Sequence, residues 1–293
     1  MVQNNPVKTV AIRRKKRYSK EAAPNRAAIW RKGGAPLDLD YDKLLGLTAE
    51  LGYQLMDSGA EIYRVEESMN RLLGAYGVTT GEVFAIPNCI IVSLTTASGH
   101  ALTQIRRMKP HGTDIERLEL YNGLCRRLCG ETPPVDEALS LVNQAGGRAR
   151  SWSLPVQLAG YFLGCGVFSL FFGGNLSDMV CGGLCGVVVG LCMAFTAHWG
   201  GNLFFRTIAS AAASALTAVF LVSLGLGEHV DQIIIGALMA LVPGIALTNA
   251  MRDIMAGDMV SGISKAAEAL LIGAAIALGT ALSLGLFQIL AGG

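Results

Sequence analysis

Long apolar runs fill the second half of this chain of 293 residues. Each of five runs is long enough to cross a lipid bilayer as a helix, which takes about 20 residues. Only 16% of all residues are charged, whereas ordinary soluble domains carry about 25%. The sequence therefore excludes an ordinary soluble fold and predicts a mainly α membrane protein with a bundle of five transmembrane helices, at residues 154–172, 179–197, 203–224, 232–251 and 261–290.

Basic residues near the ends of these runs predict the orientation of the chain. Arg148 and Arg150 precede the first run, Arg206 lies close to the second loop, and Arg252 and Lys265 flank the fourth loop. The first and third loops between the runs contain no lysine or arginine. Since short cytoplasmic loops carry the excess of Lys and Arg, we expect a multi-pass protein of the cytoplasmic membrane with its N-terminus inside and its C-terminus outside.

The part of the chain before the membrane runs divides at about residue 37. Residues 1–37 are a basic arm, because ten of the chain's 24 Lys and Arg residues lie in the first 34 positions. With little apolar surface to bury, this arm is expected to be disordered. It either contacts anionic membrane lipid or has no role. Residues 38–150 predict an N-terminal cytoplasmic α+β domain, and residues 151–293 predict the membrane domain.

The first element of the predicted cytoplasmic domain is a long helix. Its pattern runs from Asp38 to Gly77, and glycine is a common residue just past a helix end. Apolar residues recur at steps of four and three, which is the period of one helix face, with a single polar break at Ser58. The stripe consists of Leu51, Leu55, Ser58, Ile62, Val65, Met69, Leu72 and Tyr76.

Residues 82–108 change to a β-sheet pattern. Segments rich in β-branched residues are separated by turn signals at Pro87-Asn88 and Ser98-Gly99, which predicts a small antiparallel sheet. Two further helices follow, one capped by Asp114 and the other opened by Pro134. The domain is therefore expected to combine helices with one short sheet.

Small residues in the second apolar run offer a face for close helix packing. Gly182, Gly186 and Gly190 recur every four residues, and such faces let two helix backbones approach each other. The packing partner is either another helix of this chain or a second small multi-span membrane subunit, in a hetero- or homo-oligomer.

The cysteines do not form a metal or disulfide pattern. Cys125 and Cys129 share a helix face but have no His or Cys partner at zinc spacing. The cysteines of the apolar runs are expected to behave as small hydrophobic side chains. The sequence therefore indicates no metal site, no cofactor and no nucleic-acid partner.

The most informative stretch joins the last two apolar runs. Pro243 cannot donate a hydrogen bond to the carbonyl of Met239, so it kinks or breaks the fourth run. A broken helix at membrane depth is tolerated where protein or a watery cavity satisfies the freed backbone, as in transporters. We therefore predict a substrate path lined by residues at and after the break: Pro243, Gly244, Thr248, Asn249, Arg252, Asp253, Asp258, Ser261, Lys265 and Glu268.

The charged members of this set suggest two kinds of role. Arg252, Lys265 or the backbone amides near the break at Pro243-Gly244 would bind the anionic group of a substrate. Asp253, Asp258 or Glu268 would titrate in a proton-coupled cycle. The alternative is an ordinary loop whose charges lie at the membrane surface.

Four co-linear segments carry a resemblance to a known family. They are SGAEIYRVEESMNRLLGAYG at 58–77, IPNCIIVSLTTASGHALTQIRR at 86–107, DIERLELYNGLCRRL at 114–128 and LVPGIALTNAMRDIMAGDMVSGISKAAEALLIGAAIALG at 241–279. Together they resemble the threonine/serine exporter family, over about residues 42–290. The resemblance implies a cytoplasmic domain followed by a membrane domain, and export of small amino or organic acids.

The family comes in two forms, which bear on the subunit structure. Some members are single chains of ten spans, whereas others, including a succinate exporter of enteric bacteria, are split into a five-span subunit and a separate small membrane subunit. The resemblance implies that this chain is the larger subunit of the split form. It would export threonine and serine, or a succinate-like dicarboxylate, across the bacterial inner membrane.

Two other functions stay open at this point. One is a regulatory or scaffold membrane subunit whose partner carries the substrate. The other is a membrane-anchored hydrolase that uses Asp57, Glu61, His100 and His111. Because the sequence contains no nucleophile elbow, metal-ligand pair or phosphate loop, we do not expect an enzyme and assign no catalytic residue.

Overall fold

A computed structural model of the chain describes residues 39–96, 98–108, 112–146, 152–198, 200 and 202–290. The basic arm of residues 1–37, His111, Arg148 and Arg150 lie outside the described residues. The chain separates into two compact units. We call them the N-terminal unit, which comprises Met1–Arg150 and Met251–Gly262, and the helical unit, which comprises Ser151–Ala250 and Ile263–Gly293.

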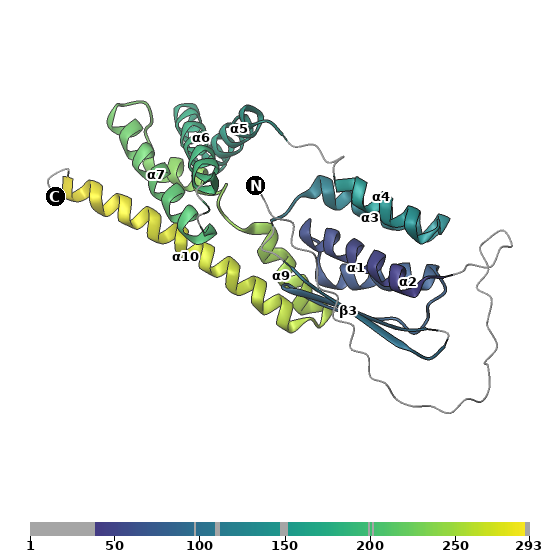
Figure 1. Cartoon of the computed structure of the whole chain (residues 1–293). Helices are drawn as coiled ribbons and strands as arrows, with labels where there is room; N and C mark the ends of the chain where they lie inside the picture. The colour runs from purple at the N-terminus through teal and green to yellow at the C-terminus, as the bar shows by residue number, and fades with distance from the viewer. Residues whose placement is uncertain are drawn as a thin grey trace. The chain divides into compact units, whose positions relative to one another are not determined.

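The N-terminal unit combines helices with a three-stranded sheet (Figure 1). The strands are antiparallel in the order β1-β2-β3, so the predicted sheet is confirmed, as are the two helices that follow it. The elements of its first segment are α1 (Tyr41–Asp57), α2 (Ile62–Ala75), β1 (Glu82–Ile86), β2 (Cys89–Thr95), β3 (Ala101–Arg107), α3 (Ile115–Glu131) and α4 (Val135–Ala145).

The single helix predicted over residues 38–77 is wrong, because the chain turns between α1 and α2. Gly59 has a φ of 92°, a conformation that glycine adopts without the steric cost of a side chain. The N–H of Ala60 donates to the carbonyl of Leu55 at 3.1 Å and closes the end of α1. The apolar stripe nevertheless identified the core correctly, since Leu51, Leu55, Ser58, Ile62, Val65, Met69, Leu72 and Tyr76 are all buried.

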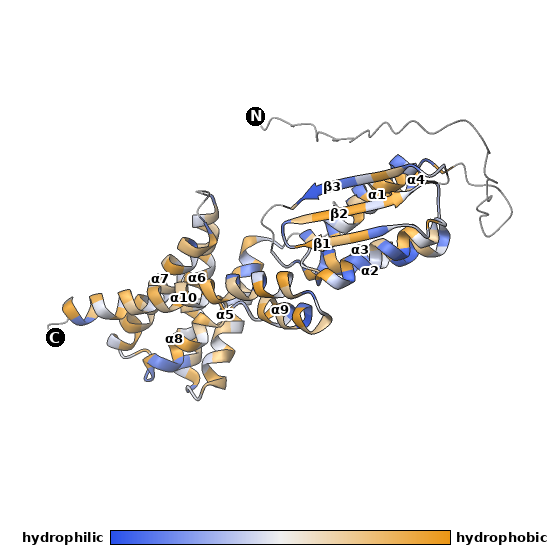
Figure 2. Cartoon of the chain, turned by 90° about the horizontal axis from the view of Figure 1, so that it is seen from below, coloured by the Kyte–Doolittle hydropathy of each residue, from blue (hydrophilic) through white to orange (hydrophobic). Residues whose placement is uncertain are grey.

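One face of the sheet is covered by helices. Ile90, Val92 and Leu94 are buried along β2, while the residues between them are more exposed, as the two-residue period of a strand requires. Helix α1 packs against β2 and β3, and α2 packs against β1. Figure 2 shows these helices behind the sheet.

Most residues of the helices in the helical unit are hydrophobic (Figure 2). It contains α5 (Leu154–Phe171), α6 (Leu176–His198), α7 (Leu203–Ser223) and α8 (Val230–Leu238), with parts of α9 (Gly244–Ala256) and α10 (Met259–Leu290). In the described part of the chain, α5, α6, α7 and α10 are long and apolar enough to cross a membrane. Four of the five predicted runs coincide with these helices, whereas the run at 232–251 forms α8 and α9.

The glycine face of α6 packs inside the chain. A Cβ atom on Gly186 would lie 2.6 Å from the carbonyl oxygen of Tyr161, and one on Gly190 would lie 2.7 Å from the Tyr161 ring. A Cβ on Gly182 would clash with the hydroxyl oxygen of Ser169. Helix α5 therefore occupies this face, and the idea that these glycines receive a second subunit is wrong, because no room remains beside them.

Candidate functional site

The fourth predicted run is interrupted where Pro243 was expected to break it. Helix α8 ends at Leu238 and α9 begins at Gly244. The N–H of Leu241 donates to the carbonyl of Leu238 at 2.8 Å, and the N–H of Leu247 donates to the carbonyl of Pro243 at 3.0 Å. Pro243 thus lies directly before α9, where its missing N–H removes no helical hydrogen bond. The predicted break is confirmed.

The residues of the predicted substrate path belong to both units. The helical unit contains Pro243, Gly244, Thr248, Asn249, Lys265 and Glu268. The N-terminal unit contains Arg252, Asp253, Asp258 and Ser261. Within the helical unit, Pro243, Asn249 and Lys265 are half-buried, and Gly244, Thr248 and Glu268 are exposed. The hydroxyl of Thr248 donates to the carbonyl of Gly244 at 2.9 Å, so it closes a local turn of α9.

An ion-pair cluster forms at the start of α2 in the N-terminal unit. Arg252 Nη1 donates to Glu61 Oε1 at 2.6 Å, and Arg64 Nε lies 3.0 Å from Glu61 Oε2. The Glu61 side chain is only 9% exposed, whereas both arginines are more than half exposed. The carboxylate of Glu61 is therefore neutralised by two cations from residues 191 positions and three positions away. These two pairings offset the desolvation cost of burying the Glu61 carboxylate.

Asp253 lies against the first turn of the same helix. Its carboxylate Oδ1 accepts the backbone N–H of Ile62 at 3.3 Å, and Asp253 is fully buried. Glu61 occupies the N-cap position of α2 but makes no capping bond with its own side chain. Asp253 supplies the capping carboxylate instead, and a negative charge at a helix N-terminus also interacts favourably with the helix dipole. The end of α9 is thus joined to α2 by two neighbouring residues.

Glu66 and Asp258 bring two carboxylates near each other in the same unit. Burial raises the pKa of the half-buried Glu66 carboxyl, and the negative charge of Asp258 raises it further. The N–H of Ala85 donates to Glu66 Oε1 at 2.7 Å, and this hydrogen bond lowers the pKa of Glu66. The turn that carries Asp258 is closed by its own N–H, which donates to the Asp253 carbonyl at 2.9 Å.

The residues considered for a hydrolase have separate surroundings. Asp57 pairs with Arg117 at 3.2 Å, Glu61 pairs with Arg252, and His100 is exposed in the turn before β3. Among the described residues, no group of three or more His, Cys, Asp and Glu side chains could hold a metal ion. The structure brings together no catalytic constellation from the described members of this set, and His111 lies outside them.

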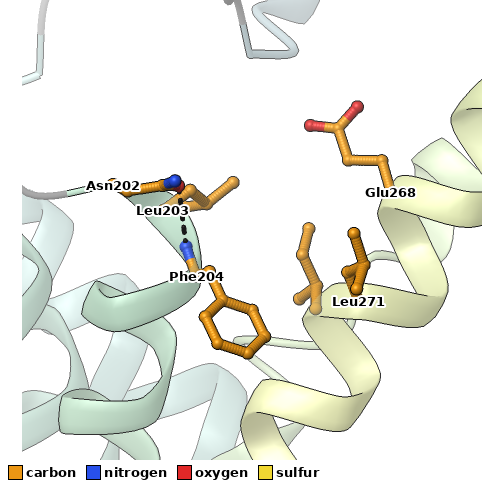
Figure 3. Close-up of a pocket in the computed structure, with 6 residues that line it drawn as sticks. Asn202, Leu203, Phe204, Glu268 and Leu271 are labelled. Atoms are coloured by element: carbon orange, nitrogen blue, oxygen red, sulfur yellow. Dashed lines mark hydrogen bonds between the residues drawn. The ribbon is translucent and has the colours of Figure 1, made fainter.

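A pocket of about 310 Å³ opens in the helical unit between the start of α7 and the middle of α10 (Figure 3). Phe204, Leu271 and Ile272 give it apolar walls, and Leu203 completes the side formed by α7. Asn202 and Glu268 are its polar lining residues. The close-up shows Asn202 on the α7 side and the Glu268 carboxylate on the α10 side.

Sequence reasoning missed several members of these sites. Glu66, Asn202 and Phe204 were not selected, and Glu61 was considered only for hydrolysis. One available signal was an asparagine directly before the apolar run at 203, which marks a helix N-cap. Asn202 Oδ1 indeed accepts the N–H of Phe204 at 3.2 Å. No comparable local signal links Glu61 to Arg252, because the pair is 191 residues apart.

Two comparisons with known proteins show which family the chain resembles. The ThrE family model, which describes threonine/serine exporters, matches residues 47–287. A protein of Mycobacterium tuberculosis named "Probable threonine/serine exporter" is 26% identical over 260 residues, which are 87% of this chain and 48% of that protein. The chain thus spans about half the length of this curated relative. No solved structure matches the chain.

Proposed function

The chain belongs to the threonine/serine exporter family, and from this premise we propose that it is a subunit of a secondary exporter in the bacterial inner membrane. The substrate is a small amino or organic acid, such as threonine, serine or a succinate-like dicarboxylate. The observation that carries the proposal is the interruption between α8 and α9. Polar backbone is freed at such a break, and in a membrane it must face protein or a watery path.

The proposed topology places residues 38–150 in the cytoplasm and the C-terminus outside. Four crossings by α5, α6, α7 and α10 would return the C-terminus to the side of the N-terminus. The proposal therefore requires α8 and α9 to act together as one interrupted crossing, the fourth of five. The one-sided distribution of basic residues supports this orientation, and a reporter fused after Gly293 should be active only outside the cytoplasm.

The proposed substrate path runs along the stretch from Pro243 to Glu268. Arg252 is the proposed partner for the substrate carboxylate, since a guanidinium binds a carboxylate with two parallel hydrogen bonds. Its side chain is 54% exposed and already pairs with Glu61. A substrate that reaches Arg252 therefore competes with Glu61, and export is coupled to the contact between α9 and α2.

We also propose that the chain works with a second, small membrane subunit. The family resemblance includes split exporters, in which a five-span subunit works with a separate small membrane subunit. Transport by the purified single chain at the full rate would contradict this part of the proposal. Transport by the partner alone would instead favour a regulatory or scaffold role for this chain.

The experiment measures uptake of labelled threonine, serine and succinate into inside-out vesicles, with and without the partner subunit. Three variants with matched membrane expression are Arg252→Lys, Asp258→Asn and Glu268→Gln. Lysine keeps the charge of Arg252 but not its paired donors, so uptake should fall by about tenfold or more. Arg126→Lys on the exposed face of α3 is the matched control.

Two results would remove parts of the proposal. If vesicles with each of the three variants take up substrate as fast as vesicles with the unmodified chain, the path does not run through residues 243–268. If vesicles with both subunits take up none of the three substrates, the chain is not an exporter of this class.

A further inference from the structure

The pocket between α7 and α10 contains one ionisable side chain, Glu268. Glu268 lies within α10, in a segment apolar enough to span a membrane. Ionisable groups in such segments are costly and usually serve a function. Among the residues that the structure describes, no cation forms an ion pair with Glu268. The carboxylate is therefore available to a ligand that brings its own positive charge.

Asn202 provides the second polar group of the pocket. Its side-chain oxygen accepts the N–H of Phe204 at 3.2 Å, and this bond fixes the direction of the amide. The amide nitrogen is then the part of the side chain left to donate a hydrogen bond. Asn202 and Glu268 come from different helices and lie on opposite sides of the opening (Figure 3).

The remaining lining is hydrocarbon, from Leu203, Phe204, Leu271 and Ile272. Small-molecule pockets typically combine apolar walls with a few polar groups that fix the orientation of the ligand. Here the polar groups are one acceptor with a negative charge and one neutral donor. This pair complements a small molecule that carries an ammonium at one end and a carboxylate at the other.

We propose that this pocket binds the zwitterion of a small amino acid during export. In this pocket the Glu268 carboxylate binds the ammonium and the Asn202 amide donates to the carboxylate, which Arg252 binds at a separate point of the proposed path. The short side chain rests on Phe204 and Leu271. The inference rests on the proposed exporter function and narrows its substrate class. A dicarboxylate brings no cation to Glu268 and places a second negative charge beside it, so it is disfavoured.

An ammonium also occurs on ethanolamine lipids, which can reach an open pocket in a membrane helix bundle. The two sources share the same contact with Glu268, and the binding assay separates them. Labelled serine is bound to the purified full chain in nanodiscs of phosphatidylglycerol, which has no amine. A second set of nanodiscs contains phosphatidylethanolamine as the competitor.

The variants are Glu268→Gln, Glu268→Asp and Asn202→Asp. We expect Glu268→Gln to weaken serine binding by about tenfold or more, because the charge of the ion pair is lost, and Glu268→Asp to restore part of the affinity. Asn202→Asp keeps a helix-capping oxygen but replaces the donor with a negative charge, so it should also weaken binding. Glu228→Gln, at an exposed position outside the pocket, is the matched control and should bind as the unmodified chain does.

The outcomes separate this inference from the exporter proposal. If the unmodified chain binds serine and Glu268→Gln does not, the pocket is supported. If vesicles nevertheless transport no serine, the exporter proposal fails while the pocket stands. Equal serine binding by the unmodified chain and Glu268→Gln overturns the pocket, even if vesicles transport serine. Failure of the unmodified chain to bind serine also overturns it. Binding of the ethanolamine lipid through Glu268, with no serine binding in its absence, assigns the pocket to lipid and overturns the inference.

Discussion

The N-terminal unit buries mostly large apolar side chains, whereas the helical unit buries many small residues and leaves many large apolar side chains exposed. Leu47, Leu51 and Met69 are fully buried in the first unit. In the second unit Ala211 and Ala215 are fully buried, while Phe171 is 77% exposed and Leu270 is 72% exposed. Ile233 on α8 is also fully buried, so the two units differ in the share of large apolar side chains that they bury.

The difference follows from the solvent that each unit meets. In water, burying a large apolar side chain is the main driving force of folding. Lipid tails are as apolar as leucine, so helices in a membrane gain little by hiding it and associate instead through close backbone contact. The N-terminal unit has the core of a water-facing domain, and the helical unit has the packing of a multi-pass membrane protein.

Polar contacts between elements also differ, although the helical unit contains an ion pair as well, between His229 and the buried Asp178 at 2.8 Å. The N-terminal unit joins its elements by ion pairs between side chains, as between Arg117 and Asp57. In the helical unit, the hydroxyl of Ser283 on α10 donates to the Ala212 carbonyl of α7 at 2.9 Å. A hydroxyl bound to a backbone carbonyl leaves no charge to desolvate, so it suits a segment that lies in lipid.

The largest expected effect comes from adding bulk to the helical unit. In Gly186→Leu, the new Cβ would meet the Tyr161 carbonyl oxygen at 2.6 Å, and backbone cannot move aside cheaply. We expect the yield of folded protein to fall by about tenfold or more, measured by size-exclusion chromatography of the solubilised chain.

Gly164→Leu on α5 is the control for this change. No atom lies within 4 Å of the position that its Cβ would take, so the variant should fold at the normal yield. If both variants fold equally well, the close contact between α5 and α6 is not what holds the helical unit together.

Removing a large buried side chain should instead destabilise the N-terminal unit. Leu51→Ala removes a fully buried side chain from α1 and leaves a cavity, which typically costs about 2–5 kcal/mol of folding free energy. Hydrogen exchange of the α1 amides in the full chain measures the loss. Exchange rates equal to those of the unmodified chain would contradict a water-type core in this unit.

The smallest expected effect concerns the Glu66 carboxylate of α2, which lies near Asp258 in the turn after α9. Burial and Asp258 raise the pKa of Glu66, so the folded state holds the Glu66 proton more tightly than the unfolded state does. The associated stability is present below the unfolded pKa and is lost as the pH rises through the raised folded pKa. Glu66→Gln keeps an oxygen for the Ala85 N–H but has no charge to desolvate.

Glu66→Gln should therefore gain stability relative to the unmodified chain as the pH rises from about 4 to 7. Because Glu66 is only half-buried, we expect less than about 1 kcal/mol. Thermal unfolding at each pH measures the difference, with Glu119→Gln at an exposed position of α3 as the control. A difference that shrinks with rising pH would contradict the assigned direction of the pKa shift.

The sequence by itself determined the features that depend on near neighbours. The period of the stripe through Leu51 and Val65 identified the core, the Pro87-Asn88 turn separated β1 from β2, and Asp114 capped α3 as expected. The length of the apolar runs identified four helices able to cross a membrane. Pro243 marked the break before α9 because proline acts on the backbone within one helical turn.

Only the tertiary structure decided which distant residues meet. Asp253 caps α2 and Arg252 pairs with Glu61 across 191 positions in the chain. Glu268 and Asn202 line one pocket although they lie on α10 and at the start of α7. Such contacts are set by how whole helices pack, and helix packing depends on many side chains together. No local pattern encodes them, whereas helix period, turns and caps are encoded within a few residues.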